Sequence, residues 1–403
     1  MKILIADKLS EGKIKKLREL GCSVVYKPDL EEEKLFREMK KDQYNILIVR
    51  STKVTSEMIR AAPTLSLIIR AGSGYNNIDV ETASMRGIYV ANCPGKNSIA
   101  VAELAFGLIL SLDRRIPDNV IQLRNGKWNK KEFSKSRGLF GRTLGIIGLG
   151  RIGREMIYRA QAFGMKIVAW SRSLTEKKAE ELGIKYVSTP EKVAEEADIV
   201  SIHLALTDDT RGLIGKDFFD SMKYGAYFIN TSRAEIVDHD ALLKAMNEKD
   251  IRVALDVFVN EPELNVGEFR DDIVNHRNLY GTHHIGGSTQ QAQDAVADEI
   301  VKIVREYLST GRVLNCVNIM KRPPAQGILV IHHRNRVGIL AEVLNVIRDA
   351  KINVERMENT IFEGGKGACA FIEIDKLLSK EDLEKIKKST DDIFFVNQIE
   401  FPQ

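Results

Sequence analysis

The sequence predicts an α/β protein with two doubly wound parallel sheets, followed by a smaller C-terminal domain of ferredoxin-like βαββαβ order. Short apolar runs alternate with charged segments of helical period up to about residue 94, and the same alternation restarts at TLGIIGLGRIG. A shorter series of different order begins at Ile328. A length of 403 residues also exceeds one ordinary hydrophobic core and favours two or three domains.

The first domain is predicted from five apolar runs: KILIA, SVVY, ILIV, LSLIIRAG and IYVANC. Charged segments such as EGKIKKLREL separate them, as in βα units on a parallel sheet. After residue 284 a long helix, STQQAQDAVADEIVKIVREYLS, is expected to return to this domain. We therefore predict a discontinuous domain of residues 1–94 and 285–316.

Residues 95–284 are predicted to form the second domain. It begins with a helix over 97–114, which is apolar almost all round and should be buried. Strands are expected at TLGIIG, MKIVAW, DIVSIHLAL, AYFINTS and RVALDVF. Residues 317–327, with two adjacent prolines and a glycine, are predicted to be a linker to the third domain, 328–403.

The bulk composition excludes several classes of protein. With 44% hydrophobic and 29% charged residues, the chain should fold, and a net charge of +4 without a long basic block does not indicate nucleic acid. Its cysteines (Cys22, Cys93, Cys316 and Cys369) lack the spacing of a disulfide framework or a metal site. We therefore expect no metal. No apolar stretch is long enough for a signal peptide or a membrane span, so we expect a cytoplasmic protein with no membrane partner.

A glycine loop, GLGRIG, directly follows an apolar strand and opens a helix. The spacing of Gly148, Gly150 and Gly153 allows a tight turn and close approach to a pyrophosphate, with Arg151 and Ile152 at the helix start. A glycine-rich turn formed for packing alone is the alternative. The strand-loop-helix context favours dinucleotide binding.

The cofactor's identity is less clear from the residues. An NAD-binding domain commonly ends its next strand with an acidic residue that binds the ribose hydroxyls. Here KIVAW is followed by Ser171 and Arg172, which suit a 2′-phosphate as readily as a bare ribose. We predict NAD, with NADP as the open alternative.

Three polar residues follow later strands, where ligands of open α/β sheets bind. They are Arg233 in NTSRAEIVD, Glu261 in LDVFVNEPE and His284 in THHIGGST. Each alone suits an ordinary loop. In this order, and together with GLGRIG, the motifs resemble those of the D-2-hydroxyacid dehydrogenase family over residues 1–310.

That resemblance implies that Arg233, Glu261 and His284 form the catalytic set. Oxidation of a secondary alcohol needs a base for the hydroxyl proton while hydride leaves for the nicotinamide. His284 would be that base, Glu261 its partner, and Arg233 the group that pairs with the substrate carboxylate. His283, where relatives usually carry proline, is a rival base.

The resemblance also assigns residues to the cofactor and the substrate. Asp256 would contact the nicotinamide carboxamide, and His203 and Thr207 would lie near the adenosine, although Ala205 replaces a usual proline. VRSTKVT and RAGSGYNNID resemble substrate loops of the D-3-phosphoglycerate dehydrogenases in this family. This implies a phosphate near three residues of the first loop and a carboxylate near two of the second: Arg50, Ser51, Lys53, Ser73 and Gly74. The alternative is a surface loop with ordinary charges.

Residues 328–403 resemble an ACT domain. His333, Asn335 and Asn353 fall where such domains bind serine, although Val337 replaces a usual proline. The resemblance implies oxidation of 3-phosphoglycerate with NAD in the first step of serine biosynthesis, an L-serine effector, and a homo-dimer or homo-tetramer. Trp128 would anchor a dimer contact or lie in the core, and a dimerisation domain without a ligand is the alternative for the C-terminal domain.

Three other functions stay open. An NADPH-dependent hydroxypyruvate or glyoxylate reductase would suit Ser171 and Arg172. A nicotinamide-sensing corepressor, or an amino-acid-binding protein, would use the same fold without catalysis.

Overall fold

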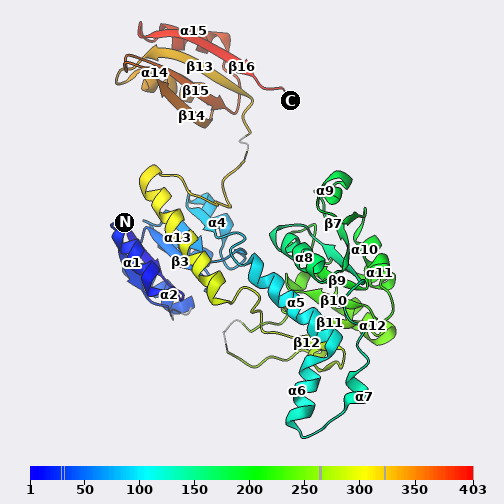
Figure 1. The fold of residues 1–403 in the computed structure, drawn as a ribbon. Helices are drawn as coiled ribbons and strands as arrows, with labels where there is room; N and C mark the ends of the chain where they lie inside the picture. Colours follow the sequence, from blue (N-terminus) through cyan, green and yellow to red (C-terminus); the bar gives the residue numbers. More distant parts are fainter. Residues whose placement is uncertain (29, 31, 263–265, 322–323, 403) are drawn as a thin grey trace. The chain divides into compact units, whose positions relative to one another are not determined.

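The computed structural model describes all residues except 29, 31, 263–265, 322, 323 and 403. The chain divides into two compact units, residues 1–318 and 319–403 (Figure 1). Each unit is described by itself. No helix in the described part of the chain combines the length and the apolar composition needed to cross a bilayer.

The first sheet of the larger unit is parallel, with the described strands in the order β2-β1-β3-β4-β5. Its strands are β1 (Lys2–Ile5), β2 (Ser23–Tyr26), β3 (Ile46–Val49), β4 (Leu67–Arg70) and β5 (Tyr89–Asn92). The connecting helices are α1 (Glu11–Glu19), α2 (Glu32–Lys41), α3 (Ser56–Ala61) and α4 (Val80–Met85). The central strands are buried on both faces, as expected when helices cover both sides of a parallel sheet.

Helix α13 (Gln290–Thr310) packs against this first sheet although the whole second sheet separates them in sequence. Its buried Ile300 and Val304 belong to the same apolar cluster as Ile3 and Ile5 of β1. The chain after α13 stays on this sheet, because the Val317 amide donates to the Val90 carbonyl over 2.8 Å.

The second sheet is also parallel, in the order β12-β11-β10-β9-β6-β7-β8. Its strands are β6 (Thr143–Ile147), β7 (Lys166–Trp170), β8 (Lys185–Tyr186), β9 (Ile199–Ile202), β10 (Tyr227–Asn230), β11 (Arg252–Leu255) and β12 (Leu279–Gly281). The order reverses between β6 and β9, and ligands of doubly wound sheets bind at such a point. This confirms the predicted second doubly wound sheet.

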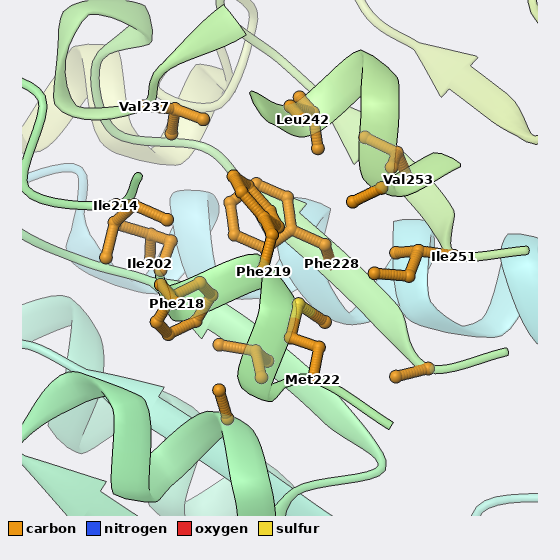
Figure 2. Packing of buried hydrophobic residues seen from close by; sticks show 14 of the residues in the cluster. Ile202, Ile214, Phe218, Phe219, Met222, Phe228, Val237, Leu242, Ile251 and Val253 are labelled. Carbon is orange, nitrogen blue, oxygen red and sulfur yellow. The ribbon is translucent and has the colours of Figure 1, made fainter. Parts of the chain in front are cut away.

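Helices cover both faces of the second sheet. One face packs on α10 (Pro190–Glu196), α11 (Lys216–Ser221) and α12 (His239–Lys249), and Figure 2 shows Phe218, Phe219 and Phe228 in that core. The other face packs on α5 (Ser98–Arg114) and α8 (Arg151–Ala162). The remaining helices are α6 (Ile116–Arg124), α7 (Lys130–Phe133), α9 (Glu176–Glu181), η1 (Ala234–Ile236) and η2 (Asp272–Asn275).

Helix α5 confirms the buried helix predicted over 97–114, because ten of its residues are buried. It ends at Arg115 in the left-handed region (φ 51°), where the chain turns into α6. Helix α6 buries none of its residues, and α6 and α7 extend beyond the sheet (Figure 1).

The smaller unit has the predicted βαββαβ order. Its elements are β13 (Gly327–Arg334), α14 (Ile339–Asp349), β14 (Val354–Ile361), β15 (Gly367–Ile374), α15 (Lys380–Lys388) and β16 (Ile393–Glu400). Neighbouring strands are antiparallel in the order β14-β15-β13-β16, which is the ferredoxin-like arrangement. The core packs Leu329 and Ile331 of β13 against Val343 and Ile347 of α14.

Candidate active site

A pocket of about 2280 Å³ lies at the carboxyl edges of the two parallel sheets. Most of the site residues predicted in the larger unit line it: Arg50, Ser51, Ser73, Gly74, Gly150, Arg151, Ile152, His203, Thr207, Arg233, Asp256, Glu261 and His284. Lys53, Gly148, Gly153, Ser171 and Arg172 are not among its described lining residues. Lys53 is exposed on the same loop as Arg50, so the structure does not bring it to the pocket.

His284 and Glu261 form a close pair in this pocket. Nδ1 of His284 lies 2.7 Å from Oε2 of Glu261, and Oε1 of Glu261 accepts the Phe258 amide over 2.8 Å. Burial raises the pKa of Glu261, but these hydrogen bonds and the charge of Arg233 lower it by more. The pKa of Glu261 therefore lies below its ordinary value. The carboxylate therefore stays charged and orients the imidazole.

Asp256 holds the loop that carries His284. It is 1% exposed, and its carboxylate accepts hydrogen bonds from Thr282 Oγ1 (2.6 Å) and from the amides of Ile285 (2.9 Å) and Gly286 (2.8 Å). His284 itself has a positive φ of 51°, which is uncommon for a residue with a side chain. The rival base, His283, also lines the pocket, but the described residues give it no hydrogen-bond or ion-pair partner.

Arg233 follows β10 in a loop tied by Asn230. Oδ1 of Asn230 accepts the amide (2.9 Å) and the hydroxyl (2.7 Å) of Ser232, and Nδ2 donates to the Arg233 carbonyl. The Arg233 guanidinium lies against Gly74, where an added Cβ would come within 2.3 Å of Nη2. A side chain at position 74 would displace the guanidinium, which explains the glycine there.

Arg70, the last residue of β4, is a site residue that the sequence analysis missed. Its guanidinium lies on Gly72, where an added Cβ would come within 1.8 Å of Nη1. Burial is the largest cause that lowers the pKa of Arg70 to about 10, and the charges of Arg233 and Arg50 lower it further. At neutral pH the group remains a cation, so the pocket brings three guanidinium groups near one another.

Three buried side-chain atoms in the described part of the chain have no hydrogen-bond partner: Arg70 Nε, His203 Nδ1 and Thr231 Oγ1. All three residues line this pocket. Buried polar atoms in proteins are nearly always paired, so an unpaired one requires an explanation. Their shared location indicates that the pocket is built to receive a polar ligand.

The glycine loop has the geometry that a dinucleotide needs. Gly148 has φ +97°, and an added Cβ would come within 2.5 Å of the His203 carbonyl oxygen. An added Cβ at Gly153 would come within 2.2 Å of the Gly148 oxygen, so the first turn of α8 packs against the loop backbone. Both positions therefore require glycine, and the start of α8 is free to face a phosphate.

Residues 106–286 match the family described as D-isomer specific 2-hydroxyacid dehydrogenase, NAD binding domain. These residues therefore form an NAD-binding domain of this dehydrogenase family. It is 41% identical over 325 residues to D-3-phosphoglycerate dehydrogenase from Methanocaldococcus jannaschii, covering 79% of this chain and 60% of that relative. The chain thus spans 60% of the length of that curated relative.

Solved structures of family members are similar in fold. The cofactor (NAD+) bound 3-phosphoglycerate dehydrogenase of Entamoeba histolytica is 29% identical with a TM-score of 0.66, covering 79% of this chain and 99% of that one. A glyoxylate reductase from Paecilomyes thermophila is 29% identical with a TM-score of 0.69, covering 79% and 98%.

The region that would receive the adenosine combines a buried residue, His203, with exposed residues of the loops after β7 and β9. Nε2 of His203 lies 2.9 Å from Ser201 Oγ, and burial lowers the pKa of His203 to about 3, so the ring stays neutral. Ser171 and Arg172 follow β7, and Nη1 of Arg172 lies 3.0 Å from Oδ2 of Asp209. The Arg172–Asp209 ion pair was not predicted.

The smaller unit separates the three residues predicted to bind serine. Nε2 of His333, which is 2% exposed, lies 3.1 Å from Asn359 Oδ1, and Asn335 donates to the Gly365 carbonyl over 3.0 Å. His333 pairs with Ala368 of β15, whereas the Asn353 carbonyl accepts the amide of Asp375, just beyond the opposite end of that strand. Seven residues of strand separate the two ends, roughly 23 Å.

Proposed function

We propose that the chain is a D-3-phosphoglycerate dehydrogenase that oxidises 3-phospho-D-glycerate to 3-phosphohydroxypyruvate. The observation that carries the proposal is one pocket holding a carboxylate-paired histidine and a group of three neighbouring arginines, Arg50, Arg70 and Arg233. Such a set suits a substrate that has one exchangeable hydroxyl proton and two separate anionic groups. The curated relatives with this name support the same assignment.

His284 would act as the base. Glu261 takes up Nδ1, so Nε2 is left to accept the proton of the substrate C2 hydroxyl. Bound NAD supplies the acceptor for the hydride. Glu261 keeps its negative charge beside the imidazole and stabilises the protonated ring that results.

The arginines would bind the two anionic ends of the substrate. Arg233 faces Gly74 beside the pair and takes the carboxylate and the C2 oxygen. We assign the phosphate to Arg50 and Arg70, because both line the pocket and Arg70 is a partly buried cation with an unpaired Nε. Asp7 fixes the loop by accepting the Arg50 amide (2.6 Å) and the Thr52 amide (3.2 Å).

The test is the initial rate of 3-phosphoglycerate oxidation with NAD, compared with glyoxylate reduction with NADPH. We expect kcat/KM to favour 3-phosphoglycerate by orders of magnitude. The second candidate is an NADPH-dependent glyoxylate or hydroxypyruvate reductase, which Arg172 and the similarity to a solved glyoxylate reductase favour. A preference for glyoxylate with NADPH would establish that function instead.

The C-terminal unit would act as an ACT regulatory domain that binds L-serine. Because Asn353 lies at the opposite end of the sheet from His333 and Asn335, one amino-acid site using all three needs a second copy of the chain. Calorimetric titration with L-serine, glycine and L-alanine tests this. We expect saturable heat with L-serine and loss of that heat in Asn353→Ala; no binding of any amino acid would favour a dimerisation domain without a ligand.

The chain would be a homo-dimer or homo-tetramer, with α6 in a subunit interface. This helix buries no residue, and its Ile116, Ile121 and Leu123 are 46%, 57% and 56% exposed. Trp128, just beyond α6, is 81% exposed, so the core location considered for it is wrong. Exposed apolar side chains gathered on one helix commonly mark a protein–protein contact.

A further inference from the structure

The turn after β7 carries cations where a carboxylate is common in NAD-binding domains. The Trp170 carbonyl accepts the Gly148 amide over 2.9 Å, so Ser171 and Arg172 follow immediately beside the glycine loop. In doubly wound domains an acid at this position binds the ribose hydroxyls of NAD, whereas an arginine accommodates the 2′-phosphate of NADP. Lys178 of α9 adds a second cation, with Nζ donating to the Ser173 carbonyl.

The structure supplies a carboxylate from another strand. Asp209 lies in the loop after β9, and Oδ2 is 3.0 Å from Nη1 of Arg172. Thr210, which is 5% exposed, shapes this loop by accepting the Thr207 amide (2.8 Å) and donating to the Ala205 carbonyl (2.7 Å). Asp209 is therefore presented to Arg172 by an ordered turn.

The pair is open to a ligand. The side chains of Arg172 and Asp209 are 67% and 76% exposed. An exposed ion pair is weak, so the guanidinium can exchange Asp209 for a phosphate at little cost. With Asp209 present, however, an incoming 2′-phosphate is repelled by the Asp209 carboxylate.

We propose that Asp209 determines the choice between NAD and NADP by occupying Arg172. While Asp209 is present, its charge offsets the guanidinium and favours the uncharged ribose of NAD. Without Asp209, Arg172 becomes a ligand for the 2′-phosphate, and the chain accepts NADP. The inference rests on the cofactor half of the proposed function and is independent of the substrate.

The test is equilibrium binding of NADH and NADPH to the full chain without substrate, followed by nicotinamide fluorescence. In Asp209→Asn we expect the Kd for NADPH to fall about tenfold, the gain of roughly one charge-assisted contact, while the Kd for NADH changes by less than about twofold. Adding Arg172→Ala to that variant should abolish the gain. Raising the ionic strength should reduce it, because both groups are exposed.

Asp208→Asn is the matched control. It makes the same charge change one residue away, and the described residues give Asp208 no ion-pair partner. An equal gain in both variants, or a gain that survives loss of Arg172, would overturn the proposal. Failure of the wild-type chain to bind either dinucleotide would overturn it together with the proposed cofactor, whereas binding without 3-phosphoglycerate oxidation would contradict the substrate assignment alone.

Discussion

Nδ1 of His284 and Oε2 of Glu261 are 2.7 Å apart, and the two residues follow neighbouring strands of one parallel sheet. The carboxyl ends of β11 and β12 thus position the proposed base and its partner. The contact leaves only Nε2 of His284 to face a substrate.

Glu261→Gln should lower kcat and change the pH dependence of stability. The pKa of Glu261 is below its ordinary value, so its stabilising contribution is present above the unfolded pKa and is lost as pH falls through the folded pKa. We expect the variant to lose about 1 kcal/mol of unfolding free energy at pH 7, allowing for partial exposure, and to approach wild type below about pH 4. Urea unfolding at several pH values measures this, and a pH-independent difference would contradict it.

His284→Ala should reduce kcat by about 10²–10⁴-fold, the usual contribution of a positioned acid/base. His283→Ala should reduce it far less, because His283 has no partner among the described residues to orient it. Steady-state kinetics of both variants, with NADH binding as a check on the cofactor site, decides between the two histidines. A greater loss in His283→Ala would reverse the assignment of the base.

Arg70→Met should stabilise the free protein and weaken substrate binding. The guanidinium is partly buried near two other cations with its Nε unpaired, so removing its charge should raise the unfolding free energy by about 1 kcal/mol. The KM for 3-phosphoglycerate should rise about tenfold or more through loss of a charge-assisted contact. Arg60→Met on the exposed face of α3 is the control and should change neither quantity.

Gly153→Ala should destabilise the nucleotide-binding domain by about 3 kcal/mol, because the new Cβ would come within 2.2 Å of the Gly148 oxygen. Gly150→Ala meets no atom within 4 Å and should leave stability within about 0.5 kcal/mol of wild type. It should nevertheless weaken NADH binding, since the backbone must approach the pyrophosphate closely. Thermal unfolding and NADH titration separate the two effects. Equal destabilisation by Gly153→Ala and Gly150→Ala would contradict the packing of Gly153 against the loop.

Ile121→Asp should weaken self-association. Ile121 is 57% exposed on α6, and a charge there would oppose burial in a subunit interface. Sedimentation equilibrium should show a larger dissociation constant for this variant. Tyr224→Asp is the control: Tyr224 is 71% exposed and lies outside α6, so this variant should self-associate as the wild type does.

The sequence was sufficient to predict which site residues the parallel strands bring together. Arg233, Glu261 and His284 each follow a strand, and strands of one parallel sheet end at the same edge, so their joint location in one pocket could be predicted. The glycine loop could be predicted because three glycines between a strand and a helix leave few backbone arrangements.

Contacts between loops far apart in sequence could not be predicted. Arg172 and Asp209 are 37 residues apart in the sequence and form an ion pair because the loops after β7 and β9 lie near one another. No local sequence pattern indicates that pair. Arg70 resembles an ordinary charged strand end in LIIR, and its burial depends on how closely Gly72 approaches it. The exposure of α6 also depends on the left-handed turn at Arg115, which has no glycine to indicate it.

The position of α13 has a consequence for the order of events during synthesis. The sheet that begins at Lys2 lacks part of its apolar covering until Ile300 and Val304 have been made. The inserted sheet, β6 to β12, is complete by Gly281 and can fold while the earlier one is still open to water. In a growing polypeptide the N-terminal sheet therefore stays unfinished until α13 has been made, the reverse of the usual N-terminal-first order.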